Sequence, residues 1–564
     1  MKRYLLFILI SILISNYSNG QNLLSPIWKY TKIDDFKEVE YSKYNNWPEI
    51  NLLLSWERQG LCWIDKNLVL RNEFFVNEKD TPLQLEFSLQ GDVHAVYINR
   101  KQITGNINNS FWSNRGQKEV IQIPNSILKK NIKNEISILI SNPSYTGGIS
   151  HNFCSIYAVN AGYVDKLSID FPQSNHIYLA NNNKQFTIKS QSVKDRIIRI
   201  MINNDFHQTL VNEFVTLKKG NQKYVFDFKK RNFKPGLYEC IAISQGQTFC
   251  GTVEWFAIQP EKISCPIQKK SGFDKFWQDA LNELRKIEPN YKIKKVDSLC
   301  SSTRNGYVVE MNSLGNLTIR GYYFIPKTGG KHPAILHVPG YGYGFENLNN
   351  FIHREGNSAE LAICVRGHGI SKDAFNPWDK MTLWAVNICD KDKYVYRSIF
   401  MDCVRAVDFL INQAEVDKDK IGVAGGSQGG GLALATAALC NSKIAACAIF
   451  DPWLCDIRDQ TKIRTTVNKE LDLFKTYPNN NCDIEQMLSV LDYVDTKYFS
   501  PDIKCPVCFL TSLFDDDCPP HCGFAAYNNL KTKKEYLVFP KDSHLGESGQ
   551  YDNLFYITEK ILSE

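Results

Sequence analysis

Hydrophobic and polar residues alternate in short runs over the first half of the chain. Between about residues 22 and 162, the runs LQLEFSL, HAVYINRKQI, VIQIP and EISILISN are rich in β-branched and aromatic residues. From about 163 to 259 the same pattern returns in QFTIKS, RIIRIMI, KYVFDF and LYECIAIS. Alternation with a period of two is typical of half-buried strands. We therefore predict two all-β sandwich domains, over 22–162 and 163–259.

The pattern changes after Pro260. The segment GFDKFWQDALNELRKI, over 272–287, has apolar residues at helical spacing. Strand-like runs such as PAILHVPG, ELAICVRG, IGVAGG, IAACAIF, CPVCFLTSL and EYLVFP then alternate with helical ones. This alternation is typical of a mostly parallel, doubly wound sheet covered by helices. The pattern over residues 260–564 therefore predicts an α/β domain, in which the polar, helical segment 456–500 forms a cap over the sheet edge.

The first twenty residues have the pattern of a cleaved signal peptide. Lys2 and Arg3 precede an apolar run over 5–14, and the small residues Ser18 and Gly20 follow it. The run is too short to span a bilayer, and no cysteine follows it to carry a lipid anchor. We predict that the protein is secreted or periplasmic and has no membrane anchor.

Composition narrows the possible partners. The 564 residues carry a net charge of only +6, and no long basic block occurs, so nucleic-acid binding has no electrostatic support. Of 17 cysteines, 13 lie from Cys265 onward, many within apolar runs, which favours buried thiols. Only the loose pair Cys505 and Cys508 approaches a zinc-like spacing, so we predict neither a metal nor a cofactor.

A glycine-rich stretch, VAGGSQGGG, carries the first chemical signal. Ser427 lies within a G-x-S-x-G match that follows a strand-like run and precedes an alanine-rich helical segment. A serine on such a strand-to-helix turn projects its hydroxyl at the carboxyl edge of the sheet. Glycine-rich turns are common, but this context predicts that Ser427 is a nucleophile.

A serine nucleophile needs a base and a carboxylate that orients the base. Only His521 and His544 follow Ser427, and His544 comes in a loop after the last strand-like run, as this fold requires. The strand-like run CPVCFLTSLF ends in three adjacent aspartates, 515–517. An acidic run of this kind is also typical of a solvated turn, and spacing alone does not separate the three. We predict His544 as the base and Asp515, the first after the strand, as the acid.

The oxyanion of an acyl-transfer intermediate requires backbone donors. The N–H of Gln428, directly after the nucleophile, is one candidate. The second is the N–H of Tyr341, in the loop PGYGYG after an earlier strand-like run. An ordinary turn is the alternative explanation of PGYGYG.

The segment 260–564 resembles the acetyl xylan esterase and cephalosporin C deacetylase family of α/β-hydrolases. The resemblance implies that Ser427 is the nucleophile, Asp515 the acid and His544 the base, with Tyr341 and Gln428 as oxyanion donors. It favours Asp515 because the family's aspartate stands three residues before Cys-Pro-Pro. The matching motifs are FDKFW (273–277), PGYGYG, VRGHGISKD (365–373), GGSQGGG, DPWLCDI (451–457), LFDDDCPP and FAAYNNL.

Two local departures from the family pattern occur. The chain has His368 where the family usually has glutamine, and two residues separate His544 from Glu547, which the family places directly after the histidine. The family often forms hexameric rings, but the added N-terminal domains leave the oligomeric state of this chain open.

The N-terminal half carries looser resemblances. Residues 22–162 look like a galactose-binding-like jelly roll, and residues 163–259 look like an immunoglobulin-like spacer. Four aromatic residues of the first domain have the chemistry to stack on a sugar, although aromatics in sandwiches more often belong to the core. They are Trp56, Trp63, Tyr97 and Trp112.

These observations predict a serine esterase that removes acetyl groups from polysaccharides or oligosaccharides through an acyl-enzyme. Its partner would be an acetylated carbohydrate. Two alternatives remain: a peptidase of the prolyl oligopeptidase type, and a sugar-binding protein with an inactive hydrolase domain. The first usually carries a propeller, for which no blade-length repeat is present, and the intact Ser, Asp and His set disfavours the second.

Overall fold

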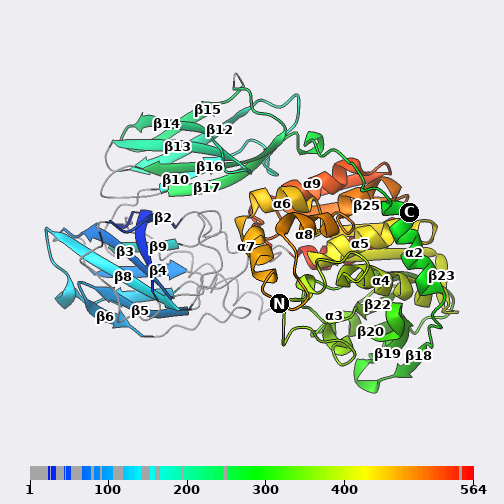
Figure 1. The fold of residues 1–564 in the computed structure, drawn as a ribbon. Coiled ribbons are helices and arrows are strands. Elements are labelled where there is room, and N and C mark those ends of the chain that lie inside the picture. Colours follow the sequence, from blue (N-terminus) through cyan, green and yellow to red (C-terminus); the bar gives the residue numbers. More distant parts are fainter. Residues whose placement is uncertain are drawn as a thin grey trace. The chain divides into compact units, whose positions relative to one another are not determined.

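The computed structural model divides after Gln259 into two compact units (Figure 1). The predicted signal peptide and Trp56, Trp63 and Trp112 lie outside the described residues. The structure describes residues 23–25, 27–33, 44, 46–52, 67–77, 82–88, 92–105, 119–141, 153–158, 166–192, 195–229, 231–244, 251–544 and 549–563.

The first part of the N-terminal unit is a pair of antiparallel sheets. One has the order β2-β1-β3-β8-β5-β6, and the other has the order β7-β4-β9. Alternate residues of both sheets, such as Leu68 and Leu70 from β3 and Leu83 and Leu85 from β4, enter one buried cluster. Tyr97 is half-buried and packs beside Val69 and Leu139. The strands are β1 (Ile27–Ile33), β2 (Glu49–Asn51), β3 (Asn67–Phe75), β4 (Leu83–Ser88), β5 (Asp92–Ile98), β6 (Lys101–Thr104), β7 (Glu119–Ile123), β8 (Lys133–Ser141) and β9 (Phe153–Ala158).

The second part repeats this design in a smaller form. Sheets of order β10-β12-β15 and β11-β17-β16-β13-β14 share a core that includes Phe186 of β12 and Ile200 of β13. The alternating strands of this unit agree with the all-β prediction for its sequence. The strands are β10 (Lys166–Asp170), β11 (Ile177–Tyr178), β12 (Gln185–Ser192), β13 (Arg196–Asn204), β14 (Thr209–Leu217), β15 (Gly220–Asp227), β16 (Gly236–Ser244) and β17 (Gly251–Ile258).

The C-terminal unit is built on a nine-stranded sheet of order β18-β19-β20-β22-β21-β23-β24-β25-β26. The strands from β22 to β26 in this order pair in parallel, and β18 to β20 form an antiparallel edge. The strands are β18 (Lys292–Lys295), β19 (Arg304–Ser313), β20 (Leu317–Pro326), β21 (His332–His337), β22 (Ala359–Cys364), β23 (Val416–Gly426), β24 (Ala446–Phe450), β25 (Val507–Ser512) and β26 (Lys534–Phe539). The helices are α2 (Phe273–Arg285), α3 (Asn349–Ile352), α4 (Val395–Ile411), α5 (Gln428–Leu439), α6 (Ile457–Ile463), α7 (Thr465–Phe474), α8 (Ile484–Leu491), α9 (Pro520–Asn529) and α10 (Gln550–Ser563).

Both faces of this sheet are covered. Ala424 of β23 shares a buried cluster with Leu554 and Leu562 of α10. Its neighbour Gly425 faces the opposite side, because side chains alternate along a strand, and there it meets Gly429 of α5. The central strands are therefore buried on both sides, which explains their continuous apolar runs and confirms the predicted mostly parallel sheet with covered faces.

The predicted cap consists of α6, α7 and α8, which lie together in Figure 1. Phe474 of α7 packs on Trp384, with 4.5 Å between ring centroids, and Trp384 packs on Trp453 in the loop after β24. The insertion thus packs against loops at the carboxyl edge of the sheet. A disulfide joins Cys482, before α8, to Cys389.

The prediction of buried free thiols is confirmed for ten of the thirteen cysteines from Cys265 onward. Of the other three, Cys300 is free but only half-buried, and Cys389 and Cys482 form a disulfide that the sequence did not predict. Among the described residues, no helix is long and apolar enough to cross a membrane.

Candidate active site

Ser427 lies on a sharp turn between the end of β23 and the start of α5. Its backbone has φ +58° and ψ −126°, a combination that side-chain-bearing residues rarely adopt and that stores roughly 1–3 kcal/mol of strain. The Ser427 N–H donates to the carbonyl of Phe450 over 2.9 Å, and its carbonyl accepts from the Trp453 N–H over 2.9 Å. These bonds hold the strained turn in place.

The glycines around Ser427 allow the chain to approach itself closely. A Cβ atom at Gly425 would lie 2.5 Å from backbone atoms of Gly429, and one at Gly431 would lie 2.2 Å from the Trp453 carbonyl. Neither position has room for a side chain. The glycine-rich sequence is therefore explained by packing of the turn and of the first turn of α5.

The structure brings Ser427, His544 and Asp515 together from three loops at the carboxyl edge of the sheet. His544 Nε2 lies 3.0 Å from Ser427 Oγ, and His544 Nδ1 lies 2.7 Å from Asp515 Oδ2. Asp515 is fully buried, and its Oδ1 accepts the backbone N–H groups of Asp517 and Cys518 over 2.8 and 2.7 Å. This geometry suits proton transfer from the serine hydroxyl to the imidazole.

Electrostatics at His544 depend on the balance between burial and its carboxylate partner. Burial alone would lower the pKa of His544, but the Asp515 carboxylate and the neighbouring Cys518 together outweigh it and raise the pKa well above the usual value. A second buried carboxyl, Asp451, lies beside Asp515, and burial and this neighbour raise the pKa of Asp451 well above its ordinary range. Its Oδ1 accepts from the Thr511 hydroxyl and the Ser512 N–H, both over 2.9 Å.

The other residues that could have served as acid or base do not contact His544 Nδ1. Asp516 is buried, whereas Asp517 is partly exposed and pairs with Arg464. His521 lies in the first turn of α9, is buried, and has its Nε2 3.7 Å from Asp459 Oδ2. Among the three adjacent aspartates, Asp515 contacts His544 Nδ1.

Tyr341 and Gln428 are also brought close together. The Gln428 side-chain amide donates to the carbonyls of Pro339 and Gly340 over 3.2 and 3.3 Å, which ties the Tyr341 loop to the start of α5. In the described part of the chain, neither backbone N–H meets a protein acceptor. Both are therefore free to donate, and that of Gln428 lies directly after Ser427, at the start of α5.

Sequence reasoning missed how the Gln428 side chain is held. Its oxygen accepts from the Tyr396 hydroxyl over 2.5 Å, and its Nε2 lies 3.0 Å from His368 Nε2. His368 Nδ1 bonds to the Arg366 carbonyl over 3.1 Å, so Nδ1 carries the proton and Nε2 accepts. Burial lowers the pKa of His368 to about 4, which keeps it neutral. The sequence carried one signal of this contact, because His368 stands where the resembled family usually has glutamine.

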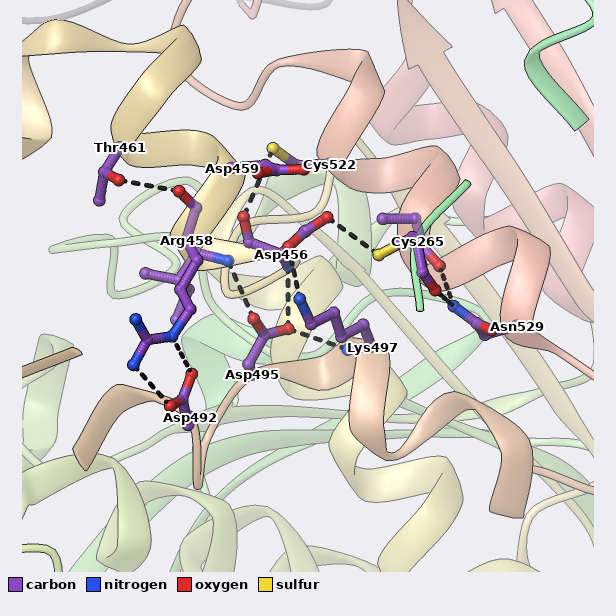
Figure 2. A network of polar contacts seen from close by, with 12 residues as sticks. Cys265, Asp456, Arg458, Asp459, Thr461, Asp492, Asp495, Lys497, Cys522 and Asn529 are labelled. Carbon is purple, nitrogen blue, oxygen red and sulfur yellow. Dashed lines mark hydrogen bonds and ion pairs between the residues drawn. The ribbon is translucent and has the colours of Figure 1, made fainter. Parts of the chain in front are cut away.

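Within the described ranges, two groups of side chains have the geometry of metal ligands. In the first, Asp515, Cys518 and His544, the acid and the base already bond to each other. The second is Asp456, Asp459 and His521. Figure 2 shows that Asp456 there already bonds to protein donors: Lys497 Nζ at 2.5 Å from Oδ1 and Cys265 Sγ at 2.9 Å from Oδ2. Both sets of ligand atoms are thus engaged within the protein.

A mostly parallel sheet with covered faces, carrying a serine on a strained strand-to-helix turn and a histidine and an aspartate on later loops, defines an α/β-hydrolase. The acetyl xylan esterase (AXE1) family matches residues 263–558, just over half of the chain. The chain therefore belongs to this family, and it is a carboxylic ester hydrolase.

The chain is also similar to individual proteins. The acetyl esterase Axe7A of Xylanibacter ruminicola is 26% identical over 359 residues, covering 62% of this chain and 79% of that protein. Among solved structures, an acetyl xylan esterase from Paenibacillus sp. R4 is 28% identical, with a TM-score of 0.49 over 54% of this chain and 98% of that one. Acetyl xylan esterase 1 from Thermoanaerobacterium sp. JW/SL YS485 is 27% identical, with a TM-score of 0.47 and the same coverage.

Proposed function

We propose that this protein is an exported serine esterase that removes acetyl groups from polysaccharides or oligosaccharides. The observation that carries the proposal is the His544 contact with both Ser427 Oγ and Asp515, within a chain of the acetyl xylan esterase family. The description of the family, acetyl xylan esterase, supports an acetylated carbohydrate as the substrate. A peptidase of the prolyl oligopeptidase type and an inactive sugar-binding protein are not favoured.

In the acylation step, Ser427 Oγ attacks the carbonyl carbon of the acetyl ester while His544 Nε2 accepts the hydroxyl proton. Asp515, bonded to Nδ1, holds the imidazole and stabilises the imidazolium. The N–H groups of Tyr341 and Gln428 donate to the oxyanion. The imidazolium then gives its proton to the sugar oxygen, the ester C–O bond breaks, and acetyl-Ser427 remains.

Deacylation repeats these steps with water. His544 Nε2 accepts a proton from the water, whose oxygen attacks the acetyl carbonyl carbon. The bond to Ser427 Oγ then breaks, acetate leaves, and the serine oxygen regains its proton from His544. No cofactor takes part in these steps.

The test is acetate release from acetylated xylan and hydrolysis of nitrophenyl esters of increasing acyl length. We expect Ser427→Ala to lower kcat by about 10⁴-fold or more, since a triad serine acts together with its base. Ser563→Ala, at a hydroxyl near the end of α10, serves as the matched control and should leave kcat unchanged. Equal activity in Ser427→Ala would disprove the mechanism, and a preference for long acyl chains or peptide bonds would disprove the substrate class.

A further inference from the structure

Asp517, the third of the three adjacent aspartates, lies beside His544 on the side opposite Asp515. Its Oδ2 is 3.6 Å from His544 Nε2, whereas Asp515 bonds Nδ1. Its Oδ1 is 2.5 Å from Arg464 Nη1. The Asp517 side chain is 24% exposed, while that of Arg464 is 7% exposed. A partly accessible carboxylate therefore stands next to the nitrogen that faces Ser427.

The position of Asp517 is set from two directions. Its backbone N–H donates to Asp515 Oδ1 over 2.8 Å, which links it to the predicted acid. Its backbone carbonyl accepts from Arg464 Nη1 over 3.2 Å and from Gln460 Nε2 over 3.3 Å. The carboxylate is thus held by the cap as well as by the loop after β25.

The start of α6, which carries Gln460 and leads to Arg464, is itself anchored by a buried network (Figure 2). The Asp495 carboxylate accepts the N–H groups of Asp456 and Ile457, both over 2.9 Å. Burial raises the pKa of Asp495 to about 7, although Lys497 opposes this rise. In the same network, Arg458 pairs with Asp492 over 2.9 Å. The support behind Asp517 is therefore built before any substrate arrives, as recognition sites require.

The chemistry at Nε2 indicates what this carboxylate meets. His544 Nε2 must deliver its proton to the oxygen of the leaving alcohol, so that oxygen lies within hydrogen-bond reach of Nε2. A group 3.6 Å from Nε2 then lies near the substituents next to the leaving oxygen. In a carbohydrate these substituents include hydroxyl groups, which a carboxylate accepts through charge-assisted hydrogen bonds. A nitrophenyl leaving group has no such hydroxyl.

We propose that Asp517, held by Arg464, is a specificity-determining residue that accepts a hydrogen bond from a free hydroxyl next to the ester of an acetylated sugar. The inference rests on the proposed function, because it takes the leaving alcohol to be a sugar. It goes further by assigning the enzyme to partly acetylated sugars, in which a neighbouring hydroxyl is free. The same carboxylate disfavours leaving groups that carry a negative charge near the ester.

The experiment compares three substrates: a monoacetylated xylo-oligosaccharide with a free neighbouring hydroxyl, a fully acetylated xylose, and nitrophenyl acetate. We expect Asp517→Ala to lower kcat/KM for the first substrate by about 10- to 100-fold, the range for one hydrogen bond to a charged group. Hydrolysis of the other two substrates should change by less than about threefold, which also shows that the variant folds with an intact site.

Two further variants sharpen the comparison. Asp517→Asn keeps an oxygen for Arg464, so it tests the inference even if the alanine variant misfolds. It should lower kcat/KM for the monoacetylated substrate selectively as well, but by a smaller factor. Asp472→Ala removes an exposed aspartate that pairs with Lys475 on the same cap, and should change none of the three rates. An equal fall on all three substrates in both Asp517 variants would overturn the inference, because Asp517 would then act on His544. Unchanged rates on all three would overturn it as well.

The same measurements distinguish a failure of the proposed function from a failure of the inference on Asp517. If the wild-type enzyme hydrolyses nitrophenyl acetate but releases acetate from neither sugar, the proposed function and this inference fall together. If it deacetylates both sugars and the Asp517 variants keep the wild-type preference between them, only this inference falls.

Discussion

At the scale of single residues, identical side chains have unlike surroundings. Asp515, Asp516 and Asp517 follow one another, yet the first bonds His544 Nδ1, the second is buried, and the third faces Arg464 and the Nε2 side of His544. The difference arises because the chain turns sharply after β25 and each side chain leaves it in a different direction. A carboxylate's chemistry here depends on its neighbours rather than on its type.

His368 provides a residue-scale prediction. The pKa of His368 in the folded protein is about 4, below the value near 6.5 of an unfolded chain, so the unfolded state binds the proton first. The stability that neutral His368 contributes is therefore complete above about pH 6.5 and is lost as the pH falls toward 4. We expect His368→Gln to remove this part of the pH dependence. Urea unfolding of both proteins at several pH values between 4 and 7 measures it.

The control for this prediction is His353→Gln, in the loop after α3, where the wild-type pH dependence should persist. Parallel stability curves for wild type and His368→Gln across pH 4–7 would contradict the prediction.

At the scale of elements, the glycines of α5 allow the helix to pack closely against neighbouring backbone. The helix is buried on nearly all sides and begins directly at the serine turn, so its first turn lies against the loop after β24. The approach at Gly431, where a Cβ would lie 2.2 Å from the Trp453 carbonyl, involves backbone that has no flexible end to move aside. The position of the Ser427 hydroxyl therefore depends on packing along the whole first turn of the helix.

We predict that Gly431→Ala lowers the free energy of unfolding by about 1–3 kcal/mol or more, as overpacking of a tight core does. It should also lower kcat, because the helix start carries the Gln428 N–H. Gly329→Ala is the matched control, since a Cβ there meets nothing within 4 Å. Thermal unfolding and nitrophenyl acetate kinetics measure both effects, and equal melting temperatures for the two variants would refute the packing argument.

At the scale of the whole molecule, the chain has two compact units, and the matched family covers the C-terminal one. The paired sheets of the N-terminal unit are antiparallel except for the β11–β17 pair, while their assignment as galactose-binding-like and immunoglobulin-like domains, over 22–162 and 163–259, stays a prediction. In the C-terminal unit, the Cys389–Cys482 disulfide spans 93 residues of sequence and joins the cap to the loop before α4. An oxidising compartment, which the predicted signal peptide implies, suits this bond.

We expect Cys389→Ser to lower the free energy of unfolding by about 2–4 kcal/mol, because the disulfide restricts a long loop in the unfolded chain. Cys482→Ser should have the same effect, and the double variant should be no less stable than either single one. Wild-type protein should respond to a reducing agent, whereas the double variant should not. Denaturant unfolding with and without dithiothreitol measures this, and an unchanged wild-type midpoint on reduction would contradict it.

Much of the fold could be predicted from the sequence because its signals are local. Periodicity distinguished the all-β half from the α/β half, and GFDKFWQDALNELRKI became α2, over Phe273–Arg285. The serine turn was also local, since glycines, a preceding strand and a following helix all lie within about 25 residues. The order of serine, acid and base along the chain followed from the order of the strands.

The sequence by itself therefore determined the class of each half, the serine turn and the small set of residues from which a site is built. Only the tertiary structure decided which aspartate bonds His544, which residues hold Gln428, which two cysteines pair, and that Asp517 faces Nε2. Each of these depends on contacts between segments that lie far apart along the chain. Their distances are set by packing of the sheet, the cap and the loops together, and no local pattern records that packing.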